Sequence, residues 1–369
     1  MSHERYMRHA LALAKRGAGW VNPNPQVGCV LVKDGRIIAE GWHHNFGNLH
    51  AERDALSRCT ESPAGATAYV TLEPCCHTGK QPPCTNALIE AGISQVVVGA
   101  ADSNPLVAGK GVSQLRDAGI TVLEGVLSAE CEELNRAWLH YITTGRPFVT
   151  MKYAMTLDGK IACHTGSSKW VTGSAARARV HEDRAKAAGI LVGVGTVLAD
   201  DPLLTARVPG AETHSPTRIV ADSHLRTPLE SQLVKTAAQV PVTIACCEGA
   251  SAARKSALEA AGCTVVELPA ENGRVSIDAL LSHLGGHGID SLIAEGGAEL
   301  HGSLLDGGFV NRVQAYVAPK LVGGAGSPTP VAGTGRLLMD EALALESVRT
   351  VQLGNDFLVE GEVTPCSPA

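Results

Sequence analysis

Hydrophobic and polar positions in the first 145 residues alternate between a helical period and a strand period. Residues 5–16 form an amphipathic helical pattern, and Asp34-Gly35 interrupts the apolar segment 27–44 as a hairpin turn would. Glycines follow several of the later helical patterns, where they are suited to end a helix. The elements predicted after this hairpin are helices at 50–59, 85–92 and 128–145, strands at 66–75 and 94–100, and a helix with a strand within 111–126. This alternation predicts a three-layer α/β unit.

A second unit begins where Gly145 and Pro147 interrupt the helical pattern and a new strand follows. Strands are predicted at 188–198, 217–223, 240–247, 263–269 and 288–297, with a β-rich segment at 312–324. Helical patterns separate several of these strands, which favours a mainly parallel sheet. No repeat relates the two halves. We therefore expect two domains, residues 1–145 and residues 146–369, with different tasks.

Composition narrows the class of protein. A chain of 369 residues exceeds what one hydrophobic core usually organises, and 40 glycines favour the tight turns of α/β folds. The formal net charge of −6 and the lack of a basic run give no support for nucleic-acid binding, so we expect a small-molecule substrate. No signal peptide and no apolar stretch of roughly 20 residues is visible, which predicts a cytoplasmic protein without membrane contact. The cysteines number 11, without regular spacing, and fit reduced thiols and metal ligands better than disulfides.

One histidine and two cysteines follow the order known from zinc deaminases, H-x-E followed by two cysteines. His50 and Glu52 stand at the start of a predicted helix, Cys75 ends a strand, and Cys84 opens a helix; a proline precedes each cysteine. Catalytic zinc takes three protein ligands, keeps one position for water and needs a proton carrier beside it. The pattern predicts Zn²⁺ bound by His50, Cys75 and Cys84, with Glu52 as the catalytic proton carrier.

Two alternatives remain open at this zinc site. Eight residues separate Cys75 from Cys84, against two in the usual deaminase signature, and Cys76 and His77 inside this segment suggest a rival ligand set. A closed structural site is the second alternative, but it normally has four protein ligands and does not need Glu52. We prefer Cys75 and Cys84, because each falls at the end of an element, where the backbone turns towards a cleft.

Four motifs carry a family resemblance in the first half: "NPNPQVG", "HAERDAL", "TLEPCCHTGKQPPC" and "DSNPLVAGKG". Together they resemble the deaminase half of the bacterial bifunctional riboflavin-biosynthesis enzymes, the RibD family, and imply a cytidine-deaminase-like fold. The resemblance also implies that Asn24 and His43 seat a pyrimidine and that Lys80 contacts the substrate. The family usually has serine at the position of Cys76.

The second half has two glycine-rich turns after predicted strands, within 189–202 and 291–305. Such turns let backbone N–H groups approach a phosphate, although glycine-assisted helix packing explains them equally well. Neither matches the dinucleotide fingerprint G-x-G-x-x-G. The motifs "MKYAMTLDGKIA", "SKWVTG", "GVGTVLADDPLLTAR", "IVADSHLRTP" and "AEGGAELHGSLL" resemble the reductase half of the same family, which implies a dihydrofolate-reductase-like α/β fold and NADPH as cofactor.

The same resemblance implies the residues of the reductase site. The expected cofactor contacts are Ala154, Trp170, Thr196, Asp200, Ser223, Gly296 and Gly297. The expected substrate contacts are Ser168, Arg184, Leu204, Arg207 and Glu295. Both arginines suit a sugar phosphate, because a guanidinium group presents a planar set of donors to phosphate oxygens. We expect Lys152 and Asp200 to be catalytic, the lysine assisting protonation of a ring-opened sugar imine and the aspartate orienting the lysine.

The sequence thus predicts a bifunctional enzyme of riboflavin biosynthesis. It would deaminate a diaminopyrimidinone that carries a ribosylamine phosphate and then reduce the ribosyl chain with NADPH, as a homo-oligomer formed through the reductase domain. A nucleoside or nucleic-acid deaminase with an unrelated C-terminal domain is the alternative enzyme. A structural zinc module joined to a ligand-binding domain is the non-enzymatic alternative.

Overall fold

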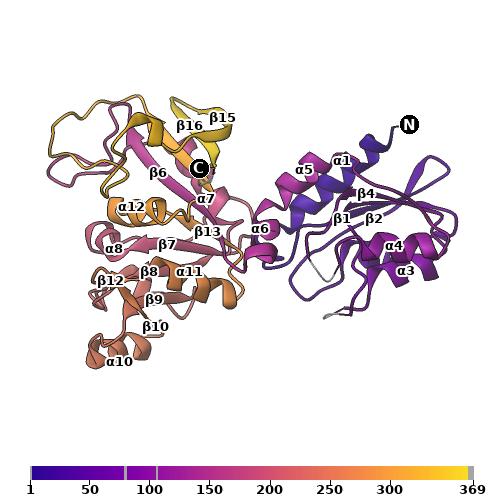
Figure 1. Cartoon of the computed structure of the whole chain (residues 1–369), viewed down its shortest axis with the longest axis horizontal. Helices are drawn as coiled ribbons and strands as arrows, with labels where there is room; N and C mark the ends of the chain where they lie inside the picture. Colours follow the sequence, from indigo (N-terminus) through magenta and orange to yellow (C-terminus); the bar gives the residue numbers. More distant parts are fainter. Residues whose placement is uncertain (1, 79–80, 105–106, 365–369) are drawn as a thin grey trace. The chain divides into compact units, whose positions relative to one another are not determined.

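The computed structural model describes residues 2–78, 81–104 and 107–364. The chain divides into two compact units, Met1–Arg146 (unit 1) and Pro147–Ala369 (unit 2), each with its own sheet (Figure 1). In the described ranges, no helix has the length and apolar character needed to cross a membrane.

Unit 1 is built on a five-stranded mixed sheet. In the spatial order β2-β1-β3-β4-β5, its strands are β2 (Arg36–Trp42), β1 (Gly28–Lys33), β3 (Thr67–Leu72), β4 (Gln95–Ala100) and β5 (Thr121–Leu123). Strand β1 is antiparallel to both neighbours, whereas β3, β4 and β5 are parallel. Asp34 and Gly35 join β1 to β2 with φ angles of 50° and 76°, which confirms the predicted hairpin turn.

Helices cover both faces of this sheet. They are α1 (His3–Ala14), α2 (Ala51–Ser57), α3 (Cys84–Glu90), α4 (Lys110–Asp117), α5 (Ser128–Leu134) and α6 (Arg136–Thr144). Alternate residues of β1 face opposite cores: Leu31 packs in the core with α2, α3 and α4, and Val30 in the core with α1, α5 and α6 (Figure 1). This confirms the predicted three-layer unit.

The closing helix of unit 1 differs from the prediction, because two helices replace the single one expected at 128–145. Asn135 separates α5 from α6 with φ −106° and ψ 16°. Its side chain accepts a hydrogen bond from the Gln26 N–H (2.8 Å) and donates one to the Gln26 carbonyl (3.0 Å). The break between α5 and α6 therefore coincides with two hydrogen bonds to Gln26, which is distant in the sequence.

Unit 2 contains a nine-stranded sheet in the order β10-β9-β8-β7-β13-β6-β14-β16-β15. Its parallel strands are β6 (Phe148–Thr156), β7 (Gly189–Gly193), β8 (Thr217–Ala221), β9 (Val242–Cys247), β10 (Thr264–Leu268), β13 (Ser291–Ala294) and β14 (Arg312–Ala318). An antiparallel hairpin of β15 (Leu345–Leu353) and β16 (Asp356–Val363) extends one edge, and β11 (Ala270–Glu271) and β12 (Arg274–Val275) form a separate pair. The sheet is mainly parallel, as predicted, but the terminal hairpin was not expected.

In the described part of unit 2, six α-helices pack on the strands: α7 (Ser174–Arg184), α8 (Val194–Asp200), α9 (Gln232–Lys235), α10 (Ala252–Ala260), α11 (Ile277–Gly286) and α12 (Ala298–Asp306). One apolar cluster joins α11 and α12 to the sheet, and another joins α8, α9 and α10. The strand predicted at 188–198 was half wrong, because β7 ends at Gly193 and α8 begins at Val194. The resulting strand-to-helix turn lies beside the pocket described below.

Candidate active sites

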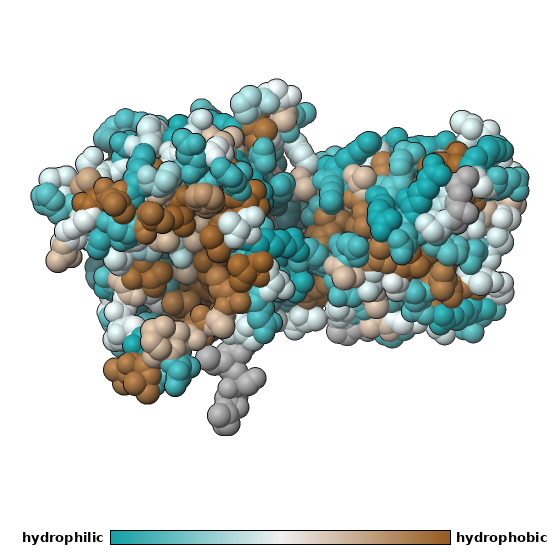
Figure 2. Space-filling view, turned by 90° about the horizontal axis from the view of Figure 1, so that it is seen from above, coloured by the Kyte–Doolittle hydropathy of each residue, from teal (hydrophilic) through white to brown (hydrophobic). Residues whose placement is uncertain are grey.

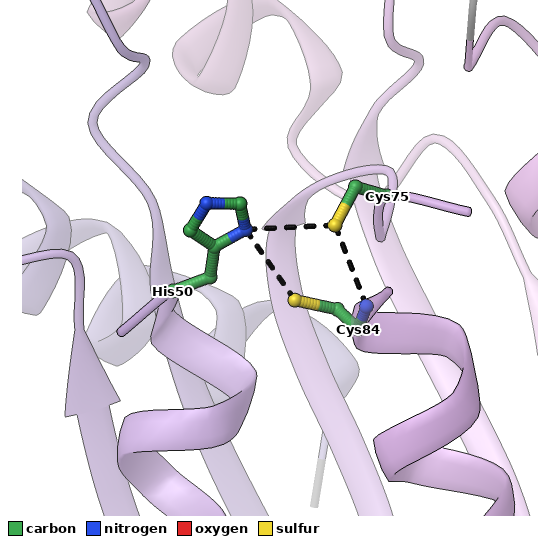
Figure 3. Close-up of side chains that lie close together, drawn as sticks. All are labelled: His50, Cys75 and Cys84. Atoms are coloured by element: carbon green, nitrogen blue, oxygen red, sulfur yellow. Dashed lines mark hydrogen bonds between the residues drawn. The ribbon is translucent and has the colours of Figure 1, made fainter. Parts of the chain in front are cut away.

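The three predicted zinc ligands of unit 1 lie together (Figure 3). His50 is the residue before α2, Cys75 follows β3, and Cys84 opens α3. The Nδ1 atom of His50 is 3.5 Å from the Sγ atom of each cysteine, and the three candidate ligand atoms lie within 4.8 Å of one another. Cys75 and Cys84 follow His50 by 25 and 34 positions in the sequence, yet the three side chains meet at one point.

This geometry fits a tetrahedral zinc ion. Zinc bond lengths of about 2.0 Å to nitrogen and about 2.3 Å to sulfur place the nitrogen and sulfur atoms about 3.5 Å apart at a tetrahedral angle. The observed distances of 3.5 Å agree with that spacing. In the part of the chain that the structure describes, neither Cys76 nor His77 belongs to the group. Three protein ligands leave a coordination position for water, as in a catalytic site.

The hydrogen bond between the two cysteine thiols favours a negative charge on Cys75. Hydrogen bonds from the Cys84 thiol, the His50 ring and the Cys84 backbone N–H lower the pKa of Cys75 to about 4, although burial opposes this. The hydrogen bond with Cys75 and burial raise the pKa of Cys84 well above its usual value. One thiolate is therefore already favoured in the protein, and thiolate is the form that binds zinc.

Glu52 lies in the first turn of α2 and is buried, with 3 % of its surface exposed. Burial, together with the charge of Cys75, raises the pKa of its carboxyl group. The same carboxyl group interacts with the Cys84 thiol, which places it against the ligand group. A buried carboxyl group at this position is suited to carry a proton to and from a reacting molecule.

Two predicted pyrimidine contacts lie beside the ligand group. The His43 ring is buried and stands edge-on to the His50 ring, with 5.3 Å between centroids. Nδ1 of His43 donates to the Leu49 carbonyl (2.9 Å), so its Nε2 atom accepts from the side-chain amide of Asn24 (3.1 Å). The structure thus brings Asn24 and His43 to the candidate zinc site. Lys80 lies outside the described residues.

Sequence reasoning missed two buried carboxyl groups at this site, Glu73 and Asp102. Glu73 accepts backbone N–H bonds from Gly109 (3.0 Å) and Val112 (3.1 Å), and so fastens the start of α4 to the end of β3. Burial, then the charges of Glu73 and Cys75, raise the pKa of Asp102 to about 7. Both residues occur in the quoted motifs "TLEPCC" and "DSNP", which were the available signal.

Unit 2 has a pocket of about 600 Å³ (pocket 1) at the carboxyl ends of β6, β7 and β13. Every predicted reductase residue except Ser223 lines it: Lys152, Ala154, Ser168, Trp170, Arg184, Thr196, Asp200, Leu204, Arg207, Glu295, Gly296 and Gly297. Ligands of open parallel sheets bind at this end of the strands. The structure therefore collects all the predicted cofactor and substrate contacts of the reductase except Ser223 in one cavity.

Glu295 is the electrostatic centre of pocket 1. Its buried carboxylate accepts two hydrogen bonds from the Arg184 guanidinium group, at 2.6 and 2.7 Å, and one from Lys152 Nζ at 3.4 Å. Burial alone would raise the pKa of Glu295, but the charges of Arg184 and Lys152 lower it to about 2. Glu295 thus accepts from the Nε and Nη2 atoms of Arg184, while the exposed Arg207 also lines the pocket and donates to the Thr205 hydroxyl group at 2.7 Å.

The expected pairing of Asp200 with Lys152 is not observed and needs correction. Register pairs Ala294 of β13 with Met151 of β6, so the next residues, Glu295 and Lys152, emerge side by side. Asp200 ends α8 and instead accepts a hydrogen bond from the Ser168 hydroxyl group at 3.4 Å. The carboxylate that orients Lys152 is therefore Glu295.

Ser223 lies in a second pocket of about 490 Å³ (pocket 2), and Gly297 lines both pockets. The two cavities therefore meet at the turn before α12. An elongated ligand that crosses this turn would contact all the predicted cofactor residues, which fits a dinucleotide.

Comparison with known proteins agrees with both halves. Residues 147–359 match the family model described as the RibD C-terminal domain, and residues 1–100 match the cytidine and deoxycytidylate deaminase zinc-binding region. The riboflavin biosynthesis protein RibD of Actinobacillus pleuropneumoniae is 52% identical over 96% of this chain and 94% of its own length. The RibD protein of Aquifex aeolicus is 41% identical, with coverages of 96% and 97%.

Solved structures agree over nearly the whole chain. Acinetobacter baumannii RibD matches with a TM-score of 0.88 and 36% identity, covering 98% of both chains. The diaminohydroxyphosphoribosylaminopyrimidine deaminase/5-amino-6-(5-phosphoribosylamino)uracil reductase of Thermotoga maritima matches with a TM-score of 0.85 and 39% identity, at the same coverage. The predicted fold class, with a cytidine-deaminase-like first domain and a reductase second domain, is confirmed.

Proposed function

Because this chain belongs to the RibD family of riboflavin biosynthesis proteins, we propose that residues 1–145 form its zinc-dependent deaminase and residues 146–369 its NADPH-dependent reductase. The chain is a bifunctional enzyme of riboflavin biosynthesis that uses Zn²⁺ and NADPH. The compact units Met1–Arg146 and Pro147–Ala369 support this division to within one residue. The substrate proposed for the deaminase is the diaminohydroxyphosphoribosylaminopyrimidine in the name of the Thermotoga relative. The substrate proposed for the reductase is the deaminated product, the 5-amino-6-(5-phosphoribosylamino)uracil in the same name.

In the deaminase, His50, Cys75 and Cys84 would hold zinc, which supplies Lewis acidity towards water. Glu52 accepts the proton of the attacking water and delivers it to the departing ammonia. Asn24 and His43 are hydrogen-bonded to each other beside His50, and their side chains orient the pyrimidine ring. Lys80 is proposed as a further substrate contact from the loop between the cysteines.

In the reductase, NADPH supplies the hydride and the protein supplies position and a proton. Glu295 holds Lys152 in pocket 1, where the lysine donates the proton that accompanies reduction of the ring-opened ribosyl group. Arg207 binds the sugar phosphate, since its guanidinium group is exposed in the same pocket. Ser168, Arg184, Leu204 and Glu295 are the other proposed substrate contacts, and Asp200 orients the Ser168 hydroxyl group.

The observation that carries the deaminase proposal is the three-ligand group with a buried carboxyl group beside it. A structural zinc module would use a fourth protein ligand and would leave Glu52 without a task. A nucleoside or nucleic-acid deaminase with an unrelated C-terminal domain does not account for the family match over residues 147–359.

We also propose a cytoplasmic homo-oligomer formed through the reductase domain. Figure 2 shows apolar side chains grouped among polar ones on the surface of unit 2. The segment that precedes β15 exposes Leu337, Leu338 and Met339, at 92, 64 and 86 % of their surfaces. Contiguous exposed apolar side chains of this kind are typical of protein interfaces.

An assay that follows ammonia and NADPH together tests the two activities. With the diaminopyrimidine substrate, we expect wild-type protein to release ammonia and then oxidise NADPH. Glu52→Gln should lower ammonia release about 10²- to 10⁴-fold, because it removes the proton carrier but no zinc ligand. The variant should keep its zinc, measured by atomic absorption, and should oxidise NADPH normally when given the deaminated product. Unchanged ammonia release by the variant would contradict the role of Glu52.

A further inference from the structure

Glu295 holds the ammonium group of Lys152 only loosely in pocket 1. The Lys152 Nζ atom is 3.4 Å from the Glu295 carboxylate, whereas the Arg184 guanidinium group approaches the same carboxylate to 2.6 and 2.7 Å. A hydrogen bond from a nitrogen donor is ordinarily about 2.9 Å long, so the contact at 3.4 Å is weak. Among the described residues, it is the one hydrogen bond of the Lys152 side chain. A flexible lysine with three rotatable donors therefore needs a further contact to keep its position.

Tyr316 supplies that contact through the face of its ring. The Lys152 Nζ atom lies over the ring, 5.6 Å from its centroid. The negative face of an aromatic ring attracts a cation at distances up to about 6 Å. Both residues belong to the wall of pocket 1. A carboxylate and a ring face thus both approach the same ammonium group.

The strand register explains why the ring lies there. Strands β6 and β14 are parallel, and their register pairs Tyr316 with Ala154, two positions after Lys152. Side chains two positions apart on a strand project from the same face of a sheet, so all three side chains share one face. The small Ala154 side chain packs against the fully buried Tyr316 ring. The ring can therefore reach the ammonium group without a bulky side chain between them.

The hydroxyl group of Tyr316 fixes the orientation of the ring. It donates to the Asp183 carboxylate at 3.3 Å, and this carboxylate also accepts from Arg179 Nε (3.0 and 3.1 Å) and from the Gln314 amide (3.3 Å). Burial, then the charge of Asp183, raises the pKa of the Tyr316 hydroxyl group, which makes it a poor proton donor at neutral pH. Tyr316 is therefore suited to position Lys152 and not to transfer the proton itself.

We propose that Tyr316 is a positioning residue of the reductase, whose ring face holds the Lys152 ammonium group in the place from which the lysine donates its proton. This proposal rests on the function proposed above, in which Lys152 donates the proton that accompanies reduction. A ring face attracts the positive charge but has no lone pair to accept the proton. It therefore holds the lysine without competing with the substrate for the proton.

NADPH oxidation by the zinc-loaded full chain, supplied with the deaminated product, tests this role. Tyr316→Leu should lower kcat about five- to twentyfold and change the KM for NADPH less than about twofold, because the lost ring contacts Lys152. Tyr316→Phe should keep at least about half of the wild-type kcat, since the ring remains and Asp183 keeps its other donors. Phe357→Leu is the control, because it removes a ring from β16 outside pocket 1, and it should change neither constant.

A double-mutant cycle separates positioning from a purely structural role. If the ring acts through Lys152, adding Tyr316→Leu to Lys152→Met should lower kcat by less than about twofold, since no ammonium group remains to be held. A structural role predicts the same loss in both backgrounds, and that result would overturn the proposal. A wild-type kcat in Tyr316→Leu, or equal losses in Tyr316→Leu and Tyr316→Phe, would also overturn it.

Fluorinated phenylalanines at position 316 keep the shape of the ring and provide the test if Tyr316→Leu does not fold. Each fluorine weakens the negative ring face, so kcat should fall stepwise from phenylalanine through the mono-, di- and trifluorinated rings. An unchanged kcat across this series would contradict the contact with the cation. If wild-type protein oxidises no NADPH with the deaminated product, the proposed reductase function itself fails, whatever the variants do.

Discussion

At the scale of single residues, Glu295 shows how one buried carboxylate organises a reactive pocket. Its side chain is 4 % exposed and touches both Arg184 and Lys152. Removing one partner of a buried ion pair lowers the free energy of unfolding by more than the intact pair contributes to it, because the remaining charges stay buried without compensation. Glu295 is therefore expected to matter for stability as well as for the position of Lys152.

Glu295→Gln should destabilise unit 2 by about 3 to 5 kcal/mol at pH 7, measured by urea unfolding. In the wild type, a folded-state pKa of about 2, against an ordinary value of 4.5, contributes about 3 kcal/mol above pH 4.5. This contribution is lost as the pH falls from 4.5 towards 2, so the difference between wild type and variant should shrink in acid. Glu267→Gln, which alters an exposed pair with Lys255, should have a far smaller effect at either pH. A constant difference across this pH range would contradict the assignment.

At the scale of elements, the deaminase site depends on how closely α2 approaches the sheet. Gly41 lies in β2, where an added Cβ atom would stand 2.5 Å from the Ala51 carbonyl oxygen and 2.3 Å from the Ala55 nitrogen. Both atoms belong to the backbone of α2 and cannot rotate away. The helix that positions His50 and Glu52 can therefore pack at this distance only over glycine.

Gly41→Ala should push α2 outward, lowering stability by about 1 to 3 kcal/mol and weakening zinc binding, because His50 would leave its place opposite the two cysteines. Competition with a chromophoric chelator measures the zinc affinity. Ser57→Ala, at an exposed position of the same helix, is the control and should leave zinc affinity unchanged. An unaltered zinc affinity in Gly41→Ala would show that α2 tolerates the displacement.

Element prediction succeeded where local periodicity was decisive and failed where a tertiary contact intervened. The hairpin at Asp34-Gly35 follows from turn chemistry alone. By contrast, the break at Asn135 accompanies its two bonds to Gln26, a residue 109 positions earlier. The short apolar run 188–198 suits a strand or a helix equally well, so the change at Gly193 was not visible in the pattern.

At the scale of the whole molecule, the residues proposed for the two activities lie in different units. All the candidate zinc ligands belong to Met1–Arg146, and the linings of pockets 1 and 2 belong to Pro147–Ala369. Because unit 2 has its own hydrophobic clusters, its stability does not require the zinc site.

Removal of zinc should therefore separate the two reactions. After dialysis against a strong chelator, ammonia release should fall at least about a hundredfold, whereas NADPH oxidation with the deaminated product should stay within about twofold of its original rate. Added Zn²⁺ should restore ammonia release. Equal loss of both activities would show that the reductase depends on the zinc site.

The sequence by itself determined which chemistry this protein carries. The spacing of His50 and Glu52 and the prolyl-cysteines Cys75 and Cys84 predicted the zinc group, because residue types and their order suffice to recognise a donor set. The family motifs indicated the reductase half, whereas the glycine-rich turns alone were explained equally well by helix packing. Alternating periods predicted two α/β units, since burial of an apolar face dictates them locally.

Only the tertiary structure decided which partners these residues meet. The neighbouring register of β6 and β13 placed Glu295, and not Asp200, beside Lys152, and the same carboxylate accepts two hydrogen bonds from Arg184. The loop after β8 placed Ser223 in a second pocket, which shares Gly297 with the first. Pairings of this kind depend on which strands become neighbours and on which charges are then compensated. Neither property can be predicted from the local order of hydrophobic and polar residues.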